Sequence, residues 1–278
     1  MQFVSVLLLS ACMAFAQGRS GWAEPFPAHR IIGPIYYVGT ADLACFLITS
    51  PSGHILINTG LAESAPMMRK SIESLGFKVA DIKVALTNQA HFDHVAALAE
   101  IKKISGAKVM VTEGDKALLE DGGRGDFLLG ESSWFTPVKS DGILKDGQTI
   151  SLGDIKLRTH LTPGHTKGSV TYSMAVRENG KEYNVVFANI PTVIGAPLVD
   201  NKKYPNIAKD FEKSFRIMKA LACDVFLAAH GSQYNLAKKY KPAYDPNAFV
   251  DREGYKATLL SAEQRYQGQL KQDREKLR

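Results

Sequence analysis

Residues 87–98, TNQAHFDHVAAL, place two histidines and an aspartate within four positions. His91, Asp93 and His94 are spaced like metal ligands on a tight turn, and zinc binds both histidine nitrogen and aspartate oxygen. Such close spacing lets successive side chains point to different metal ions. Gln89 stands where another histidine would complete the set, and its amide oxygen is a weaker donor to zinc than imidazole. The stretch predicts a metal site with one exchanged ligand.

Two more histidines stand at similar places, where a predicted strand ends in a turn. His165 lies in LTPGHTKGS and His230 in FLAAHGS. A rigid sheet can build a metal site from ligands gathered at strand ends from distant sequence positions. Four histidines and Asp93 are too few for two closed tetrahedral zinc sites. They suffice for two open sites that also bind water, which is the catalytic form.

The elements that must position these residues alternate between strands and helices in each half of the chain. Two sheets packed together with helices outside would satisfy this pattern, so we expect an α/β fold, a four-layer αββα sandwich with two mixed sheets. Strands are predicted at 31–40, 44–50, 54–60, 82–88, 107–112, 148–153, 155–162, 169–176, 183–189 and 223–230, and helices at 63–76, 95–106, 113–123, 207–221 and from 246 to the C-terminus.

Residues 121–141 form a Gly-rich irregular segment that contains Phe127 and Trp134. A loop of this length is often functional, as a lid or a binding loop, so its aromatic side chains either wall a substrate cleft or pin the loop down. The tripeptide Arg124-Gly125-Asp126 is interpreted as part of this loop, without a role of its own.

Charge and composition exclude several classes of protein. The chain has 278 residues, a formal net charge of +6 and 22% charged residues. Lys and Arg are scattered, which indicates a basic surface rather than a nucleic-acid or membrane partner. No C-x-x-C motif occurs, which excludes a cysteine-based zinc finger, and Cys45 and Cys223 are expected to be buried free thiols.

The N-terminus has the pattern of an export signal. Residues 1–16 contain an apolar run that is too short to span a membrane, and Ala14-Phe15-Ala16 forms a cleavage site. LSAC also has the pattern of a lipoprotein box ending at Cys12. We expect a signal peptide at 1–16, a single domain at 17–278, and a periplasmic protein that is either free or lipid-anchored through Cys12.

The segments QAHFDH, GHTKGS and AAHGS resemble the motifs of the metallo-β-lactamase fold, which are H-x-H-x-D-H, a distant G-H-T and a late histidine. The resemblance covers nearly the whole chain after the export signal. Order and spacing are most similar to subclass B3, whose members are periplasmic zinc enzymes that hydrolyse penicillins, cephalosporins and carbapenems. The resemblance therefore implies an enzyme that acts as a monomer on a small-molecule β-lactam and confers antibiotic resistance. It implies no protein or nucleic-acid partner.

The resemblance also implies a role for each candidate ligand. Asp93 would be catalytic, because it holds one zinc and orients the metal-bound hydroxide that attacks the lactam carbonyl. No serine nucleophile in a G-x-S-x-G turn is present. One or two zinc ions per chain are expected, since Gln89 weakens the first site. The ligand sets implied are Gln89, His91 and His165 for the first zinc and Asp93, His94 and His230 for the second.

Two departures from the family pattern concern residues near the site. Many relatives carry two serines, which bind the substrate carboxylate, where this chain has Ile190 and Thr192. Ile190 cannot donate a hydrogen bond to the substrate carboxylate. Thr192 can do so, and Lys167 or a lysine of NKKYP can assist it. Asn58 replaces an aspartate, and we expect it to support the structure rather than bind metal.

Tyr234 follows His230 closely, and both pocket lining and core packing suit it. His160, on the strand before the third motif, is expected to lie outside the ligand set.

The same motif start serves other hydrolases of this fold, so the substrate stays open. Glyoxalase II-like thioesterases and lactonases bridge both metals with an aspartate where this chain has Asn189-Ile190. Neither side chain can bridge, which disfavours thioesters and lactones. A non-catalytic zinc-binding relative, impaired by Gln89 and Ile190, is the remaining alternative. Some subclass B3 relatives carry glutamine at this position and remain hydrolases, which favours an enzyme.

Overall fold

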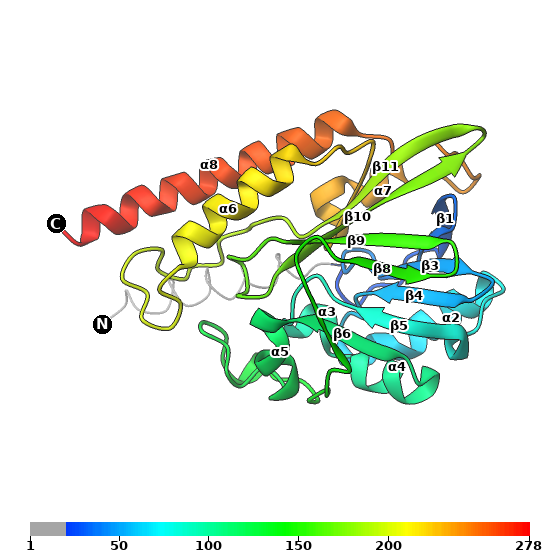
Figure 1. Ribbon diagram of the computed structural model, residues 1–278, viewed down its shortest axis with the longest axis horizontal. Coiled ribbons are helices and arrows are strands. Elements are labelled where there is room, and N and C mark those ends of the chain that lie inside the picture. The colour runs from blue at the N-terminus through cyan, green and yellow to red at the C-terminus, as the bar shows by residue number, and fades with distance from the viewer. Residues whose placement is uncertain (1–20) are drawn as a thin grey trace, which may run out of the picture.

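The computed structural model describes residues 21–278 and has two β-sheets packed between layers of helices (Figure 1). The predicted signal peptide at 1–16, with Cys12, lies outside the described residues. The first sheet has the order β1-β2-β3-β4-β5-β6-β7 and the second β12-β11-β10-β9-β8. Each sheet contains both parallel and antiparallel pairs, as β4–β5 and β3–β4 illustrate in the first. The predicted αββα sandwich with two mixed sheets is confirmed.

The strands are β1 His29–Ile32, β2 Ile35–Tyr37, β3 Phe46–Ser50, β4 Gly53–Ile57, β5 Ile82–Leu86, β6 Lys108–Thr112, β7 Gly142–Leu144, β8 Thr149–Leu152, β9 Ile155–Leu161, β10 Val170–Glu178, β11 Lys181–Ala188 and β12 Val225–Ala228. The helices are α2 Ala65–Ser74, α3 Phe92–Val95, α4 Leu98–Ser105, α5 Glu113–Glu120, α6 Ile207–Ala220, α7 Leu236–Lys239 and α8 Arg252–Lys276. Short 3-10 turns are η1 Ala62–Ser64, η2 Val79–Asp81, η3 Glu131–Ser133 and η4 Gly231–Tyr234.

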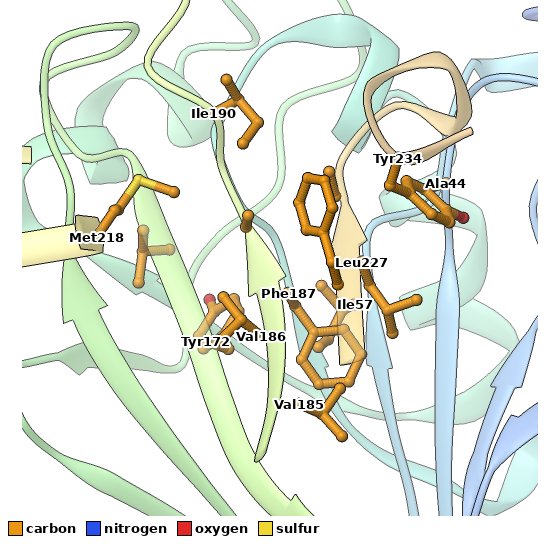
Figure 2. Packing of buried hydrophobic residues seen from close by; sticks show 14 of the residues in the cluster. Ala44, Ile57, Tyr172, Val185, Val186, Phe187, Ile190, Met218, Leu227 and Tyr234 are labelled. Carbon is orange, nitrogen blue, oxygen red and sulfur yellow. The ribbon is translucent and has the colours of Figure 1, made fainter. Parts of the chain in front are cut away.

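The main core lies between the sheets and beneath the helices of the second one (Figure 2). The rings of Phe46 on β3 and Phe187 on β11 meet edge to face with centroids 5.2 Å apart. Alternate residues of a strand face opposite sides, so Val186 points away from Phe187. All of β11 from Val185 onward is buried, because it lies between a sheet and a helix layer.

Helix α6 packs beside α8 over the second sheet (Figure 1). Ile207, Phe211, Phe215 and Met218 are all buried, as the helical spacing predicts. The ring of Phe211 stacks on Tyr266 of α8 at 5.4 Å.

Helix α8 begins later than the sequence predicts. It starts at Arg252 rather than near residue 246, because the Asp251 side chain accepts a hydrogen bond from Gly254 N and caps it there. Strand β7 has no counterpart among the predicted strands. Cys45 and Cys223 are free. Within 21–278, no helix is long and apolar enough to cross a membrane.

Candidate metal centre

The six predicted ligands meet at one edge of the two sheets, on segments that follow buried strands. Four of them are histidines that form two pairs of rings in edge contact, and the Asp93 carboxylate lies against the second pair, His94 and His230. The His91 and His165 rings are 5.0 Å apart at their centroids, and so are the rings of His94 and His230. Strand β5 leads into the segment with Gln89, His91, Asp93 and His94, the turn between β9 and β10 carries His165, and β12 leads to His230.

Asp93, His94 and His230 form one compact group. Asp93 Oδ2 lies 3.3 Å from His94 Nε2 and 3.5 Å from His230 Nε2. One ligand atom from each residue falls within 4.8 Å of the others, which suits a single metal ion. Both ring nitrogens of His94 are buried without a hydrogen-bond partner. Buried polar atoms are rarely left unpaired, so this group fits a metal as its missing partner.

Gln89, His91 and His165 are the ligands expected for the other metal, and all three are at most 8% exposed. Gln89 Oε1 is buried and has no hydrogen-bond partner, although it is the acceptor atom of the amide. Gln89, His91 and His165 together offer one amide oxygen and two imidazoles, which are all neutral donors. The group of Asp93, His94 and His230 contains a carboxylate. The Gln89 group therefore fits a metal, with weaker donors than those around Asp93.

A carboxylate from the 121–141 loop supports His91. Asp126 Oδ2 lies 3.1 Å from His91 Nε2, and both side chains are buried. Asp126 Oδ1 accepts hydrogen bonds from the backbone N–H groups of Leu128 and Leu129, at 2.7 and 2.6 Å. Because Nε2–H donates to Asp126, Nδ1 is the nitrogen of His91 left for a metal. Arg124-Gly125-Asp126 lies in a loop as predicted, and Asp126 in addition holds His91.

His165 and His230 are oriented through their Nδ1 atoms. His165 Nδ1 lies 2.8 Å from the Thr192 carbonyl oxygen and 2.9 Å from Thr192 Oγ1. His230 Nδ1 lies 3.0 Å from Asp42 Oδ2, and Asp42 also accepts from Ser232 N. In both residues Nε2 is left to face the centre, and a polar partner fixes the ring, as metal-binding histidines require.

The protonation states of these groups suit the binding of a cation. Burial, with the nearby His91, lowers the pKa of His165 to about 3. Burial also lowers the pKa of His94 to about 4, although the Asp93 charge acts in the opposite direction, so both rings are neutral at pH 7. Burial acts to raise the pKa of Asp93, but the surrounding histidines outweigh it and hold the pKa below its ordinary value. An ionised carboxylate and neutral imidazoles are the forms that bind zinc.

Burial likewise acts to lower the pKa of His91 and His230, yet their carboxylate partners hold both above the ordinary value.

Buried polar side chains lock the ligand-bearing segments together. Asp115 on α5 accepts hydrogen bonds from Ala90 N, Thr166 Oγ1 and Gly168 N, each at 2.8 Å, so one carboxylate ties the His91 segment to the His165 turn. Burial raises the pKa of Asp115. Isolated aspartates such as Asp42, Asp115 and Asp126 have no local spacing pattern, which is why sequence analysis missed them.

An asparagine network lies beneath the same segments. Asn58 Nδ2 donates to Asn88 Oδ1 at 2.9 Å, and Asn189 Nδ2 donates to the Asn88 carbonyl at 3.0 Å. Asn58 has a positive φ of 63°, which asparagine tolerates better than most residues. It has the supporting role expected for it.

The residues expected to bind substrate are placed less favourably. Ile190 is 2% exposed and belongs to the core, and Tyr234 is fully buried among aromatic rings (Figure 2). Core packing, one of the two positions expected for Tyr234, is confirmed. Ile190 borders a hollow, but its apolar side chain offers no hydrogen bond. Thr192 holds His165, and Lys167 is exposed above the Tyr204 ring at 5.7 Å.

Three other predicted features take structural positions. His160 hydrogen-bonds Ser173 Oγ at 2.7 Å and lies outside the ligand groups, as expected. Phe127 packs on Tyr204 with centroids 5.2 Å apart, which pins the loop. Trp134 is 41% exposed, and the Arg124 guanidinium lies 4.9 Å from its ring.

Comparison with known proteins agrees with this geometry. Residues 42–177 match the family model of the metallo-beta-lactamase superfamily. A class B3 di-zinc metallo-beta-lactamase, LRA-12 from an Alaskan soil metagenome, is 44% identical, with a TM-score of 0.87 over 90% of this chain and 97% of that chain. This chain belongs to the metallo-beta-lactamase superfamily. A second superfamily member, GOB-18 from Elizabethkingia meningoseptica, is 40% identical, with a TM-score of 0.88 over 91% of this chain and 95% of that one.

Curated relatives in the superfamily are more distant. The probable metallo-hydrolase YqgX of Bacillus subtilis is 30% identical over 87 residues, which are 31% of this chain and 41% of that protein. A hydroxyacylglutathione hydrolase from Bradyrhizobium is 27% identical over 127 residues, which are 46% of this chain and 41% of that protein. The matches thus span about two fifths of these relatives, whereas the solved metallo-beta-lactamases match over almost their whole length.

Proposed function

We propose that this protein hydrolyses the β-lactam amide bond of penicillins, cephalosporins and carbapenems, with zinc as cofactor. The observation that carries the proposal is the pair of ligand groups, in which Gln89 Oε1 and both ring nitrogens of His94 are buried without a hydrogen-bond partner. The likeness to class B3 structures at 40–44% identity supports the same substrate class. The reaction consumes one water across the C–N bond and gives a carboxylate and an amine.

Gln89, His91 and His165 would hold one zinc, and Asp93, His94 and His230 the other. When bound, zinc activates water for attack and polarises the carbonyl. Asp93 would orient the attacking water, because its carboxylate lies within 3.5 Å of a nitrogen of both His94 and His230 and is ionised at neutral pH. Asp126, Thr192 and Asp42 keep the rings in the orientation and tautomer that catalysis needs.

Metal occupancy should differ between the two sites. The Gln89 site has three neutral donors, and an amide oxygen is a poorer zinc ligand than imidazole. The Asp93 site has a buried carboxylate. We infer that the Asp93 site fills first and that the chain binds fewer than two zinc ions when the metal is limiting.

Thioester and lactone hydrolysis is the second candidate, because hydroxyacylglutathione hydrolases are among the relatives. Asn189 argues against it. Its side chain donates to the Asn88 carbonyl at 3.0 Å and its backbone N–H to Thr171 Oγ1 at 3.1 Å, so it is used within the protein. An amide in this position does not replace a carboxylate that bridges two cations.

We also propose that the protein is exported to the periplasm, either as a free protein or with a lipid anchor at Cys12. There it would act as a monomer and confer antibiotic resistance. A periplasmic location would place the enzyme between entering β-lactams and their targets. Fractionation of cells that express the whole chain, with Cys12→Ser as the comparison, tests both forms of export.

The activity is tested with the zinc-loaded protein and a chromogenic cephalosporin. We expect hydrolysis that a chelator abolishes and added zinc restores, and we expect Asp93→Asn to remain folded with little turnover. Thioester and lactone substrates are assayed in parallel. A folded, zinc-loaded wild type that turns over no β-lactam would contradict the proposal and support a non-catalytic zinc-binding protein.

A further inference from the structure

The positions of the two family serines offer a single hydroxyl to a substrate carboxylate in this chain, that of Thr192. Ile190 is apolar and 2% exposed, and Thr192 Oγ1 lies 2.9 Å from His165 Nδ1. The β-lactams proposed as substrates carry a carboxylate next to the reacting ring. An anion of this kind binds best where a cation and polar N–H or O–H groups converge. The substrate carboxylate therefore needs a further anchor on this chain, one that carries a positive charge.

A hollow of about 410 Å³ opens beside the metal centre, between the segment that follows β11, the turn η4 and helix α8. The hollow adjoins both ligand groups, because two of the residues that line it hold a site histidine, either directly or through another residue. Thr192 lines it and holds His165, while Ser232 lines it and donates its N–H to Asp42, the partner of His230. Its remaining polar lining consists of Gln233, Thr258, Ser261 and Arg265.

Arg265 is the cation of this hollow. Its Nη1 donates to Ser261 Oγ at 2.8 Å, one turn earlier on α8, which holds the side chain along the helix. No carboxylate among residues 21–278 lies within ion-pair distance of its guanidinium. Arg252, at the start of the same helix, is by contrast paired with Asp224. The Arg265 guanidinium therefore keeps N–H groups for an external anion, and its planar fork matches a carboxylate.

We propose that this hollow is the subsite for the substrate carboxylate, with Arg265 as the charged anchor and Ser232 and Ser261 as hydroxyl partners. The inference rests on the proposed β-lactam hydrolysis and identifies the residue that selects anionic substrates. Arg265 is a positioning residue that binds the substrate away from the reacting bond. It explains how a chain with a buried Ile190 can hold a carboxylate at the edge of its metal centre.

The test compares a cephalosporin that has a free carboxylate with its neutral ester, on the zinc-loaded full chain. Arg265→Ala should lower kcat/KM for the free acid about ten- to a hundredfold, the range for a lost charge-assisted hydrogen bond. The loss should lie mainly in KM, with ester hydrolysis and zinc content unchanged. Arg265→Lys should recover part of the loss. Arg274→Ala removes the same charge farther along α8 and should match the wild type.

Two outcomes overturn the subsite while leaving the enzyme intact: Arg265→Ala hydrolyses the free acid like the wild type, or it loses activity equally on acid and ester. A wild type that is folded and zinc-loaded but hydrolyses neither substrate overturns the proposed function, and the carboxylate subsite with it. The result with the wild type therefore distinguishes the two failures.

Discussion

The contact between Asp126 and His91 leads to the sharpest prediction about metal binding. Asp126→Asn removes the negative charge but keeps a carbonyl oxygen for the N–H groups of Leu128 and Leu129, so the loop turn is retained. In the native protein, Asp126 Oδ2 accepts a hydrogen bond from His91 Nε2 at 3.1 Å. The asparagine of the variant can place an amide N–H group at this position instead. His91 then either loses this partner or becomes protonated at Nδ1, the nitrogen assigned to the metal.

Both results weaken the Gln89 site, and the size of the effect can be estimated. Loss of a partner behind a metal-binding histidine typically lowers metal affinity about ten- to a hundredfold, which corresponds to about 1.4–2.7 kcal/mol. A hydrogen bond to a charged group contributes about 1.5–3 kcal/mol, which is the same range. The upper end is expected here, because both side chains are buried and solvent cannot replace the carboxylate.

The assay is a zinc titration of metal-free protein against a chelating dye, which resolves the two sites by affinity. We expect Asp126→Asn to weaken one step and leave the other unchanged. Asp121→Asn is the matched control, since Asp121 accepts hydrogen bonds from Arg124 N and Gly125 N in the same loop but does not contact His91. Equal titrations for wild type and Asp126→Asn, or equal losses for both variants, would refute the reasoning.

Two other variants test the donor strength at the Gln89 site and the basis of acid stability. Gln89→His replaces an amide oxygen with imidazole and should raise zinc bound at limiting metal toward about two per chain; full occupancy of the wild type at trace zinc would contradict this. The Asp224 pKa lies below its ordinary 3.8, because Asn184 N–H groups and Arg252 outweigh burial. Its stabilisation is thus present above pH 4 and lost as pH falls below it. Asp224→Asn should lower Tm at pH 6 but much less at pH 3, and an equal loss at both would exclude a charge effect.

The candidate metal ligands could be picked out from the sequence because their signals are local. His91, Asp93 and His94 fall within four residues after a buried strand, and His165 and His230 each end a strand in a turn. The sandwich followed from the alternation of apolar strands and amphipathic helices. Both depend on contacts between near neighbours or on periodicity, which a single sequence contains.

The residues that orient the ligands were not predictable in the same way. Asp42 is 188 positions from His230, and Asp126 is 35 from His91. An aspartate in a loop has no pattern that separates it from a solvated one, so its role appears only when the fold sets its distance. Tyr234 shows the opposite problem, since its sequence position suits both cleft and core and only the aromatic packing around it decides.

Charge explains why the two halves of the centre differ. The Asp93 site combines an anionic ligand with His230, which is itself supported by the Asp42 carboxylate. The Gln89 site has no anionic ligand, so Asp126 supplies the carboxylate behind it. A neutral donor at Gln89 thus makes the first site depend on an aspartate of the 121–141 loop, whereas the second contains a carboxylate ligand of its own, Asp93. Metal in the first site should therefore respond to changes in the 121–141 loop, and metal in the second should not.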